Sequence, residues 1–308
     1  MAIGKYIKEI GRGKEGARSL SREQAADLFG QVLDGAVTDL EIGAFCLAMR
    51  IKGETAVEMA GFLDATHARL HKLPDNGHST IVIPSYNGAR KLPLLTPLLA
   101  LLLAREGLPV LIHGAATESS RVFTDAVLQA LDIAPHDPAL PVIPGSVAFV
   151  PTERLCAGLQ KLLEVRRIVN LRNSAHSVVK LMNPCAGKSM LVSSYTHPEY
   201  AVSMADTFCI MQSNAMLLRG TEGESVADPR RTPRMQAFIQ GKPIDLEAYQ
   251  NGPLITLPDL PSTTDAKSTA QYIREVLAGD KPIPSPIAQQ VAHLLRIHAQ
   301  TNTSTAAP

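Results

Sequence analysis

Three capping boxes near the N-terminus constrain the fold more than any other feature of this 308-residue sequence. In a capping box, a Ser or Thr at a helix start and a Glu or Gln three residues later satisfy each other's exposed backbone amides. The boxes begin at Ser21, Thr38 and Thr55. Apolar residues recur behind them at spacings of three and four, as on one face of a helix. The N-terminal part of the chain therefore predicts a helical unit.

The pattern changes after residues 73–80, where Pro, Asn and Gly indicate a hinge or linker. Two short aliphatic runs, at residues 80–83 and 110–112, predict buried strands. Helix patterns follow them at residues 94–105 and 121–131. Such alternation favours parallel β/α units, in which ligands bind beyond the carboxyl ends of the strands.

The loops that follow these two strands, residues 85–91 and 113–120, are therefore where we expect a ligand. The remaining patterns predict strands at residues 191–195 and 215–218, and helices at residues 153–181, 265–278 and 287–298. The low-complexity tail from Thr301 is expected to be frayed. The predicted fold class is α/β, with a helical N-terminal small domain and an α/β large domain.

The domain boundary is expected in the linker. We predict a small domain at residues 1–78, joined by helices from about 153–183, and a large domain at residues 79–308. Four scattered cysteines without a CxxC pair indicate reduced thiols, and the sequence begins without an apolar signal segment. The longest apolar run, residues 94–104, is too short to span a bilayer. We therefore expect a cytoplasmic protein with no membrane partner.

Charge clusters carry more information than the formal net charge of +1, which predicts no partner by itself. One basic cluster comprises Lys161, Arg166, Arg167, Arg172 and Lys180, opposed in sequence only by Glu164. Another, at the N-terminus, comprises Lys5, Lys8, Arg12, Lys14 and Arg18. The N-terminal cluster is interleaved with Glu9 and Glu15, which favours ordinary surface charge. A basic helix is also usually a solvated face.

Several blocks, in order along the chain, resemble the anthranilate phosphoribosyltransferase (glycosyl transferase family 3) superfamily. They are residues 50–55, His113-Gly114, Arg166-Arg167 with Arg172, Asn183-Pro184, and residues 220–224. The resemblance covers nearly the whole chain. It implies a helical small domain and an α/β large domain of the nucleoside phosphorylase/phosphoribosyltransferase type. It also implies a homodimer formed through the helical domain.

The loops depart from the pattern of the family enzymes. Their Gly-Thr-Gly-Gly-Asp-Gly, whose amides hold pyrophosphate, is replaced at residues 84–88 by Pro-Ser-Tyr-Asn-Gly. Their Asn-x-Ser-Thr retains only Thr96, and their Lys-His-Gly-Asn-Arg segment retains only His113-Gly114. Their magnesium-binding Asp-Glu pair falls near Gly223-Glu224, where Glu222 and Glu224 are a partial substitute at best. We therefore expect no cofactor, Mg²⁺ included, and no anthranilate activity.

Residues 83–91, 172–176 and 197–200 resemble a divergent YbiB-like branch of the superfamily. This resemblance implies a dimer that binds nucleic acid, and DNA is the expected form. The residues expected to contact phosphates are Arg90, Lys91, Lys161, Arg166, Arg167, Arg172 and Lys180. Tyr86 is a candidate for stacking on a base, although a chain without tryptophan offers little for an aromatic platform.

The alternative is a transferase with an unknown donor or an acceptor other than anthranilate; no catalytic residue is identified. A residual phosphate or ligand pocket would be lined by Ser85, Tyr86, Asn87, Gly88, Thr96, His113, Thr117, Ser119, Ser120, Asn173 and His176. Structural roles compete with this interpretation. His176 and His197 are equally typical of structural histidines, His113-Gly114 of a tight turn, and Ser119-Ser120 of helix caps.

Overall fold

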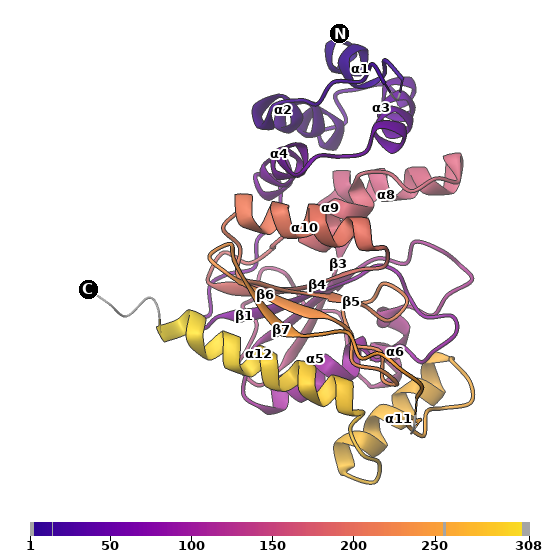
Figure 1. Cartoon of the computed structure of the whole chain (residues 1–308), viewed down its shortest axis with the longest axis vertical. Coiled ribbons are helices and arrows are strands. Elements are labelled where there is room, and N and C mark those ends of the chain that lie inside the picture. Colours follow the sequence, from indigo (N-terminus) through magenta and orange to yellow (C-terminus); the bar gives the residue numbers. More distant parts are fainter. Residues whose placement is uncertain (1–2, 14, 255–256, 304–308) are drawn as a thin grey trace. The chain divides into compact units, whose positions relative to one another are not determined.

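The computed structural model describes residues 3–13, 15–254 and 257–303. These residues form two compact units, each built from two stretches of chain (Figure 1). Unit 1 comprises Met1–Lys72 and Thr152–Pro184, and unit 2 comprises Leu73–Pro151 and Cys185–Pro308. The helices of residues 152–184 lie in sequence between two strands of unit 2, but they belong to the N-terminal bundle.

Unit 1 is entirely helical. Its helices are α1 (Gly4–Ile10), α2 (Arg22–Leu33), α3 (Asp39–Lys52), α4 (Ala56–His67), α7 (Thr152–Leu155), α8 (Ala157–Val169) and α9 (Ala175–Leu181). All three expected capping boxes are confirmed. Ser21 with Gln24, Thr38 with Glu41 and Thr55 with Glu58 each exchange both side-chain-to-backbone hydrogen bonds. Local sequence therefore sets the start of α2, α3 and α4.

Aromatic packing and one glycine hold the bundle together. The rings of Phe29 and Phe62 stack with centroids 4.6 Å apart, and Phe45 packs edge-on against both. These three side chains are fully buried. A Cβ on Gly61 would lie 2.3 Å from the carbonyl oxygen of Arg22, so only glycine allows α4 to approach α2 this closely.

Unit 2 is built on one seven-stranded sheet in the order β3-β2-β1-β4-β5-β6-β7. The strands are β1 (Thr80–Ser85), β2 (Val110–Gly114), β3 (Val147–Pro151), β4 (Ser189–Tyr195), β5 (Ala215–Arg219), β6 (Met235–Ile239) and β7 (Lys242–Glu247). The first five are parallel, and β6 and β7 are antiparallel additions. Strand order reverses between β1 and β4, which makes their carboxyl ends the switch point of the sheet.

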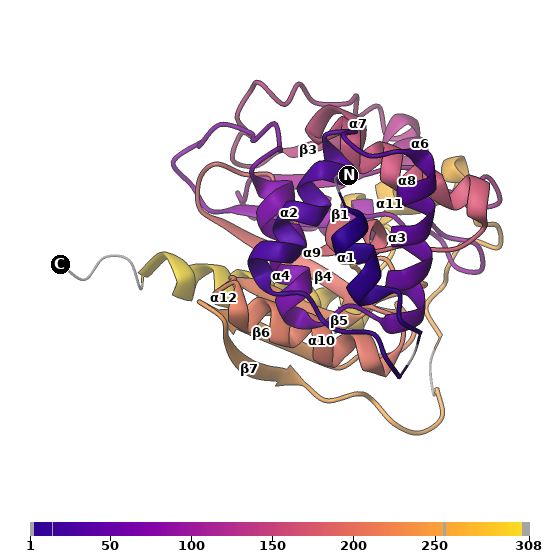
Figure 2. The same ribbon diagram turned by 90° about the horizontal axis from the view of Figure 1, so that it is seen from above.

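Helices cover both faces of this sheet. Their bounds are α5 (Thr96–Arg105), α6 (Thr124–Ala130), α10 (Pro198–Ile210), α11 (Ala266–Ala278) and α12 (Ser285–Thr303). Leucines of α5 and apolar residues of α11 and α12 form one core with the β-branched residues of the strands. Helix α10 packs on β4, β5 and β7, and Figure 2 shows it beside β6 and β7.

The structure corrects several sequence-based boundaries. Strand β2 continues through His113 and Gly114, which were expected to begin the loop after the strand. Strands β3, β6 and β7 and helices α1 and α10 were not predicted, and α12 extends past Thr301 to Thr303. In the described ranges, no helix combines the length and the apolar character needed to cross a bilayer.

Candidate functional site

The carboxyl ends of β1, β4 and β5 lie side by side in unit 2, and a loop after β5 closes over them. The carboxylate of Glu224 in this loop lies at the end of β1, and the residue is 1% exposed. Its Oε2 accepts hydrogen bonds from the hydroxyls of Ser85, at 2.5 Å, and Thr96, at 3.1 Å. Its Oε1 accepts from the amides of Asn87 and Gly88, both at 2.7 Å. Four donors therefore match the roughly four lone-pair positions of a carboxylate.

Glu222, two residues earlier, binds the continuation of the same β1 loop. Its carboxylate accepts from the amides of Arg90 at 3.0 Å, Lys91 at 2.7 Å and Leu92 at 3.0 Å. The Arg121 guanidinium lies 3.5 Å away and completes the arrangement. The backbone of the loop is thereby fixed, while the side chains of Arg90 and Lys91 are exposed.

The turn that carries both glutamates is tight. Glu222 has φ +52° and Gly223 has φ +92°, and the Glu224 amide donates to the Thr221 carbonyl. Two consecutive positive φ angles are typical of a type I′ turn, and the first is uncommon for a residue with a side chain. The Asn87 side chain donates to the Glu222 carbonyl, and the Ser194 hydroxyl donates to the Gly223 carbonyl.

Tyr86 and His113 form a buried pair next to this site. The Tyr86 hydroxyl lies 2.8 Å from His113 Nδ1, and Tyr86 is only 3% exposed. The expectation that Tyr86 stacks on a base is therefore wrong, because its ring faces the interior. Complete burial lowers the pKa of His113 to about 3. Its Nε2 has no hydrogen-bond partner among the described residues.

The other expected pocket residues of unit 2 divide into buried and exposed groups. The Thr117 hydroxyl is buried and donates to the Tyr86 carbonyl. Ser119 and Ser120 are exposed, and Ser120 donates to Glu118. They do not cap a helix, because α6 begins only at Thr124 and its N-cap makes no side-chain bond.

The basic cluster of α8 and α9 surrounds a histidine in unit 1. Burial, together with the positive charges of Arg172, Arg166 and Lys180, lowers the pKa of His176 to about 3. These three side chains are half-buried, and the sequence places them on three separate segments. The structure therefore brings three of the expected cations close to one imidazole. Its Nε2 also lacks a partner within the described part of the chain.

Asn173 connects α8 with the start of α9 through hydrogen bonds. Its side-chain amide donates to the Leu162 carbonyl at 2.8 Å, and its side-chain oxygen accepts from the Ala175 amide at 3.0 Å. Asn173 is thus a structural residue that positions the cluster. Of the remaining expected cations, Lys161 and Arg167 are exposed on α8, whereas Arg90 and Lys91 belong to unit 2. Their expected proximity to the α8–α9 cluster stays a prediction.

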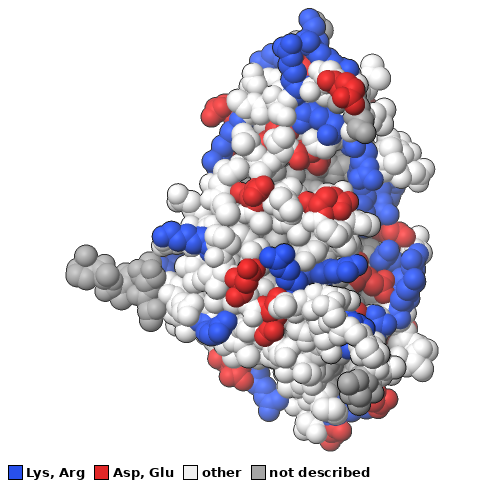
Figure 3. All heavy atoms as spheres, in the orientation of Figure 1, with Lys and Arg blue, Asp and Glu red and all other residues white. Residues whose placement is uncertain are grey.

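The N-terminal basic cluster is paired with acids. Arg12 and Arg18 both contact Glu9, at 2.8 and 3.6 Å, and Lys5 lies 3.9 Å from Asp27. Lys14 lies outside the described residues. Basic side chains also stand beside acidic ones on the face drawn in Figure 3. These pairs support the interpretation of this cluster as ordinary surface charge.

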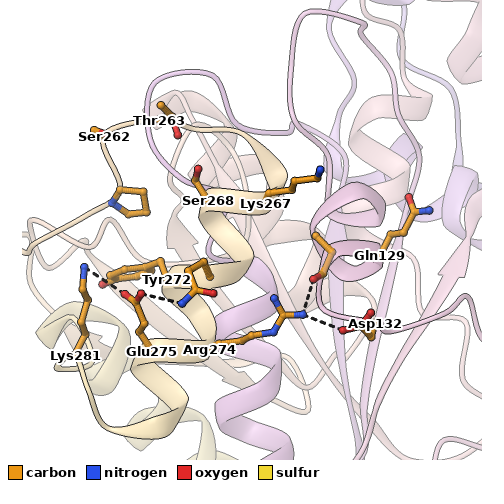
Figure 4. Close-up of a pocket in the computed structure, with 13 residues that line it drawn as sticks. Gln129, Asp132, Ser262, Thr263, Lys267, Ser268, Tyr272, Arg274, Glu275 and Lys281 are labelled. Atoms are coloured by element: carbon orange, nitrogen blue, oxygen red, sulfur yellow. Dashed lines mark hydrogen bonds and ion pairs between the residues drawn. The ribbon is translucent and has the colours of Figure 1, made fainter.

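A hollow of about 730 Å³ lies between the C-terminal end of α6 and one side of α11 (Figure 4). Arg274 at its floor donates to the Ala130 carbonyl and to Asp132. Lys281 pairs with Asp259 and Glu275. Arg274, Lys281, Asp132 and Glu275 are therefore satisfied by neighbours. Within the described ranges, no group of three or more His, Cys, Asp or Glu side chains is arranged to hold a metal ion.

Comparison with known proteins places this architecture in a family. Residues 5–69 match the glycosyl transferase family helical bundle domain. The chain is 40% identical over 309 residues to "Uncharacterized protein YbiB" of Escherichia coli strain K12, covering 95% of this chain and 93% of that protein. It is 27% identical to an anthranilate phosphoribosyltransferase of Salinispora arenicola, covering 91% of this chain and 82% of that protein.

The fold comparison agrees. The crystal structure of anthranilate phosphoribosyltransferase from Thermus thermophilus superposes with a TM-score of 0.72 at 20% identity, covering 98% of this chain and 90% of that one. The chain therefore belongs to the anthranilate phosphoribosyltransferase (glycosyl transferase family 3) superfamily. Within that superfamily it falls in the YbiB-like branch, as its sequence motifs predicted.

Sequence reasoning missed the main role of the loop after β5. It considered Glu222 and Glu224 as partial metal ligands, whereas both carboxylates bind donors of the β1 loop. It also missed Arg121 and Ser194, which hold that loop from either side. The two glycines at positions 220 and 223 were the available signal, because closely spaced glycines indicate a turn pressed against other backbone.

Proposed function

We propose that this protein is a dimeric, catalytically degraded member of its superfamily that binds DNA without reading its sequence. The convergence of Arg166, Arg172 and Lys180 on His176 carries this proposal. Burial is the main cause of the lowered pKa of His176, and the three positive charges add to it because cations disfavour protonation. A polyanion is the natural counterpart of such a group of cations, because each phosphate contact releases a condensed counterion.

Each unit has exposed cations that we propose as further DNA contacts. Lys161 and Arg167 project from α8, and Arg90 and Lys91 project from the loop that Glu222 fixes. We propose that these side chains contact phosphates and not base edges. Contacts to phosphates alone position nucleic acid but carry no sequence information. The expected affinity is therefore similar for unrelated sequences.

The state of the β1 loop supports the loss of transferase chemistry. The amides and hydroxyls around Glu224 are already saturated by its carboxylate. A magnesium ion at Glu224 would have to compete with all four of these donors. We therefore propose a function without Mg²⁺ or another cofactor. We also propose that the protein acts in the cytoplasm.

An apolar stripe on α3 supports self-association through the helical domain. Leu40, Leu47 and Ile51 are 83%, 51% and 56% exposed. Their spacing of seven and four residues places them on one face of the helix. A second copy of the chain could bury this stripe, and two bound copies would join two basic clusters and raise avidity. Substitution of Leu47→Glu is expected to give monomers in sedimentation experiments and weaker DNA binding.

A salt titration with labelled DNA tests the proposed function most directly. With about five phosphate contacts, the logarithm of the affinity should fall with a slope of about −4 to −5 against the logarithm of salt concentration. Two duplexes of unrelated sequence should give the same curve, and an RNA duplex identifies the preferred nucleic acid. An affinity that does not change with salt would rule out this function.

A transferase with a different donor or acceptor is the competing function. Two observations favour it. The fold of the superfamily is retained, and the hydroxyls of Ser85, Thr96 and Thr117 lie near the switch point. Calorimetry with phosphoribosyl pyrophosphate and Mg²⁺ distinguishes the two. Heat of binding at micromolar ligand would favour the transferase, and no heat at millimolar ligand would favour the DNA-binding function.

A further inference from the structure

The loop between β5 and β6 fills the place where this sheet topology puts a ligand. Ligands of open parallel sheets bind where the strand order reverses, which here is between the carboxyl ends of β1 and β4. The Ser194 hydroxyl, on β4, donates to the Gly223 carbonyl. Asn87, just after β1, donates its side-chain amide to the Glu222 carbonyl. The turn therefore spans the switch point and is held on both sides.

Two sets of donors at this point have the composition of anion sites. The amides of Asn87 and Gly88 converge with two hydroxyls on one point, and three successive amides, Arg90 to Leu92, converge with a guanidinium on another. Runs of backbone amides that point to a common centre form anion-binding concavities. Amides, hydroxyls and a guanidinium donate equally well to the oxygens of a carboxylate and to those of a phosphate. Each centre is occupied by a carboxylate of the same chain.

The backbone of the turn is specialised for this placement. A Cβ on Gly220 would lie 1.9 Å from the Glu224 carbonyl oxygen, and one on Gly223 would lie 2.0 Å from the Asn87 side-chain nitrogen. Glu222 adopts a positive φ that is unfavourable for a residue with a side chain. Backbone strain of this kind persists only where surrounding contacts hold it, and here those contacts are the hydrogen bonds of the two carboxylates.

We infer that Glu222 and Glu224 are internal ligands that occupy a two-centre anion site and exclude small phosphorylated anions from it. The inference concerns unit 2 alone and does not depend on DNA binding. Removing either carboxylate while leaving the donors in place should convert the β1 loop into a phosphate site. Inorganic pyrophosphate, without metal, is the simplest anion that can address both centres.

Binding of pyrophosphate to four variants tests this inference. Glu224→Ala and Glu222→Ala each vacate one centre. Glu224→Gln keeps the volume of the side chain but replaces one accepting oxygen with an amide nitrogen, which donates and cannot accept. Glu118→Ala removes a carboxylate near Arg121 without vacating either centre, and it is the matched control for net charge.

Calorimetry should show no binding of millimolar pyrophosphate to the wild type, to Glu118→Ala or to Glu224→Gln. It should show binding to Glu224→Ala and Glu222→Ala at least roughly 30-fold tighter than to the wild type. Because unsatisfied buried donors destabilise a fold, Glu224→Ala should melt several degrees lower, and pyrophosphate should restore much of the loss.

Three results would overturn the inference. The first is pyrophosphate binding to the wild type as tight as to the alanine variants, which would mean that the carboxylates do not exclude it. The second is no binding to either alanine variant, which would mean that the donors do not form an anion site. The third is equal binding to Glu118→Ala, which would mean that charge alone matters. If Glu224→Ala does not fold, Glu222→Ala decides the question, because the Glu222 side chain is 17% exposed and less embedded.

Discussion

His113 in unit 2 and His176 in unit 1 are both buried histidines with a depressed pKa, but their surroundings differ. Burial alone lowers the pKa of His113, whereas Arg172, Arg166 and Lys180 add to the effect at His176. Around His113 the nearby anion-binding donors are neutralised by glutamates of the same chain. The comparison teaches that burial alone can give such a low pKa, whereas at His176 three cations on separate segments contribute as well.

The largest expected effect concerns His113 and stability in acid. Its folded pKa of about 3 lies below the ordinary value of 6.5, so the folded state stays neutral while the unfolded chain takes up a proton. Its contribution is therefore present above pH 6.5 and is lost as the pH falls toward 3. By pH 4 the loss amounts to about 3 kcal/mol.

Chemical denaturation of the wild type and of His113→Gln at pH 7 and pH 4 checks this. The variant should lose roughly 3 kcal/mol less between the two pH values. Equal losses in both proteins would break the comparison, since His113 would then be accessible to solvent protons. His176 and His67 titrate in the same direction, so only the difference between the two proteins is informative.

Charge reversal in the helical unit should give the next largest effect. Arg166→Glu with Arg172→Glu is expected to weaken DNA binding roughly 100-fold at moderate salt, because two attractive contacts become repulsive. Fluorescence anisotropy with the same labelled duplex measures it. Lys242→Glu with Lys267→Glu changes the net charge equally on exposed positions of unit 2 and should cost much less. Equal losses would mean that net charge, and not the α8–α9 cluster, governs binding.

A smaller effect is expected at the loop that Glu222 fixes. Replacing Arg90 and Lys91 together with Ala should reduce affinity about tenfold and make the salt slope shallower by up to about 2. Both side chains are exposed, so thermal stability should not change. An unchanged slope would confine DNA binding to unit 1.

The smallest effect is expected for the helix cap at the start of α3 in unit 1. Thr38→Ala removes the side chain that accepts from the Glu41 amide and should lower the free energy of unfolding by about 1 kcal/mol. DNA affinity and its salt dependence should stay unchanged. A change in affinity would indicate that the cationic region depends on the stability of the whole bundle.

Local sequence rules predicted the helical unit better than the sheet. Caps at Ser21, Thr38 and Thr55 are satisfied within one turn, so the sequence specifies them directly. Strands β6 and β7 lack such a signal, since β7 is largely exposed and mixes Lys, Pro and Asp with Ile and Leu. Strand β6 pairs with β5, and β7 pairs with β6. No local sequence pattern indicates this pairing.

The sequence predicted where the candidate site lies but not which groups its loop binds. The β1 loop and the basic residues of α8 and α9 follow from the strand pattern and the charge pattern. The partner of that loop does not, because Glu224 follows Asn87 by 137 residues in the sequence. Long-range contacts of this kind arise from strand order, and the sequence alone could not show which carboxylate meets which amide. The gathering of cations around His176 likewise depends on the bend that Asn173 fixes.

The outermost strand limits how two copies of this protein can associate. Pro243 contributes no N–H group to β7, and Lys242, Asp245 and Glu247 place charges along the same short segment. Such a border discourages another chain from extending the sheet through main-chain pairing. Assembly by addition of strands is therefore disfavoured at this side, which leaves helix-to-helix contact as the more favourable way for two copies to meet.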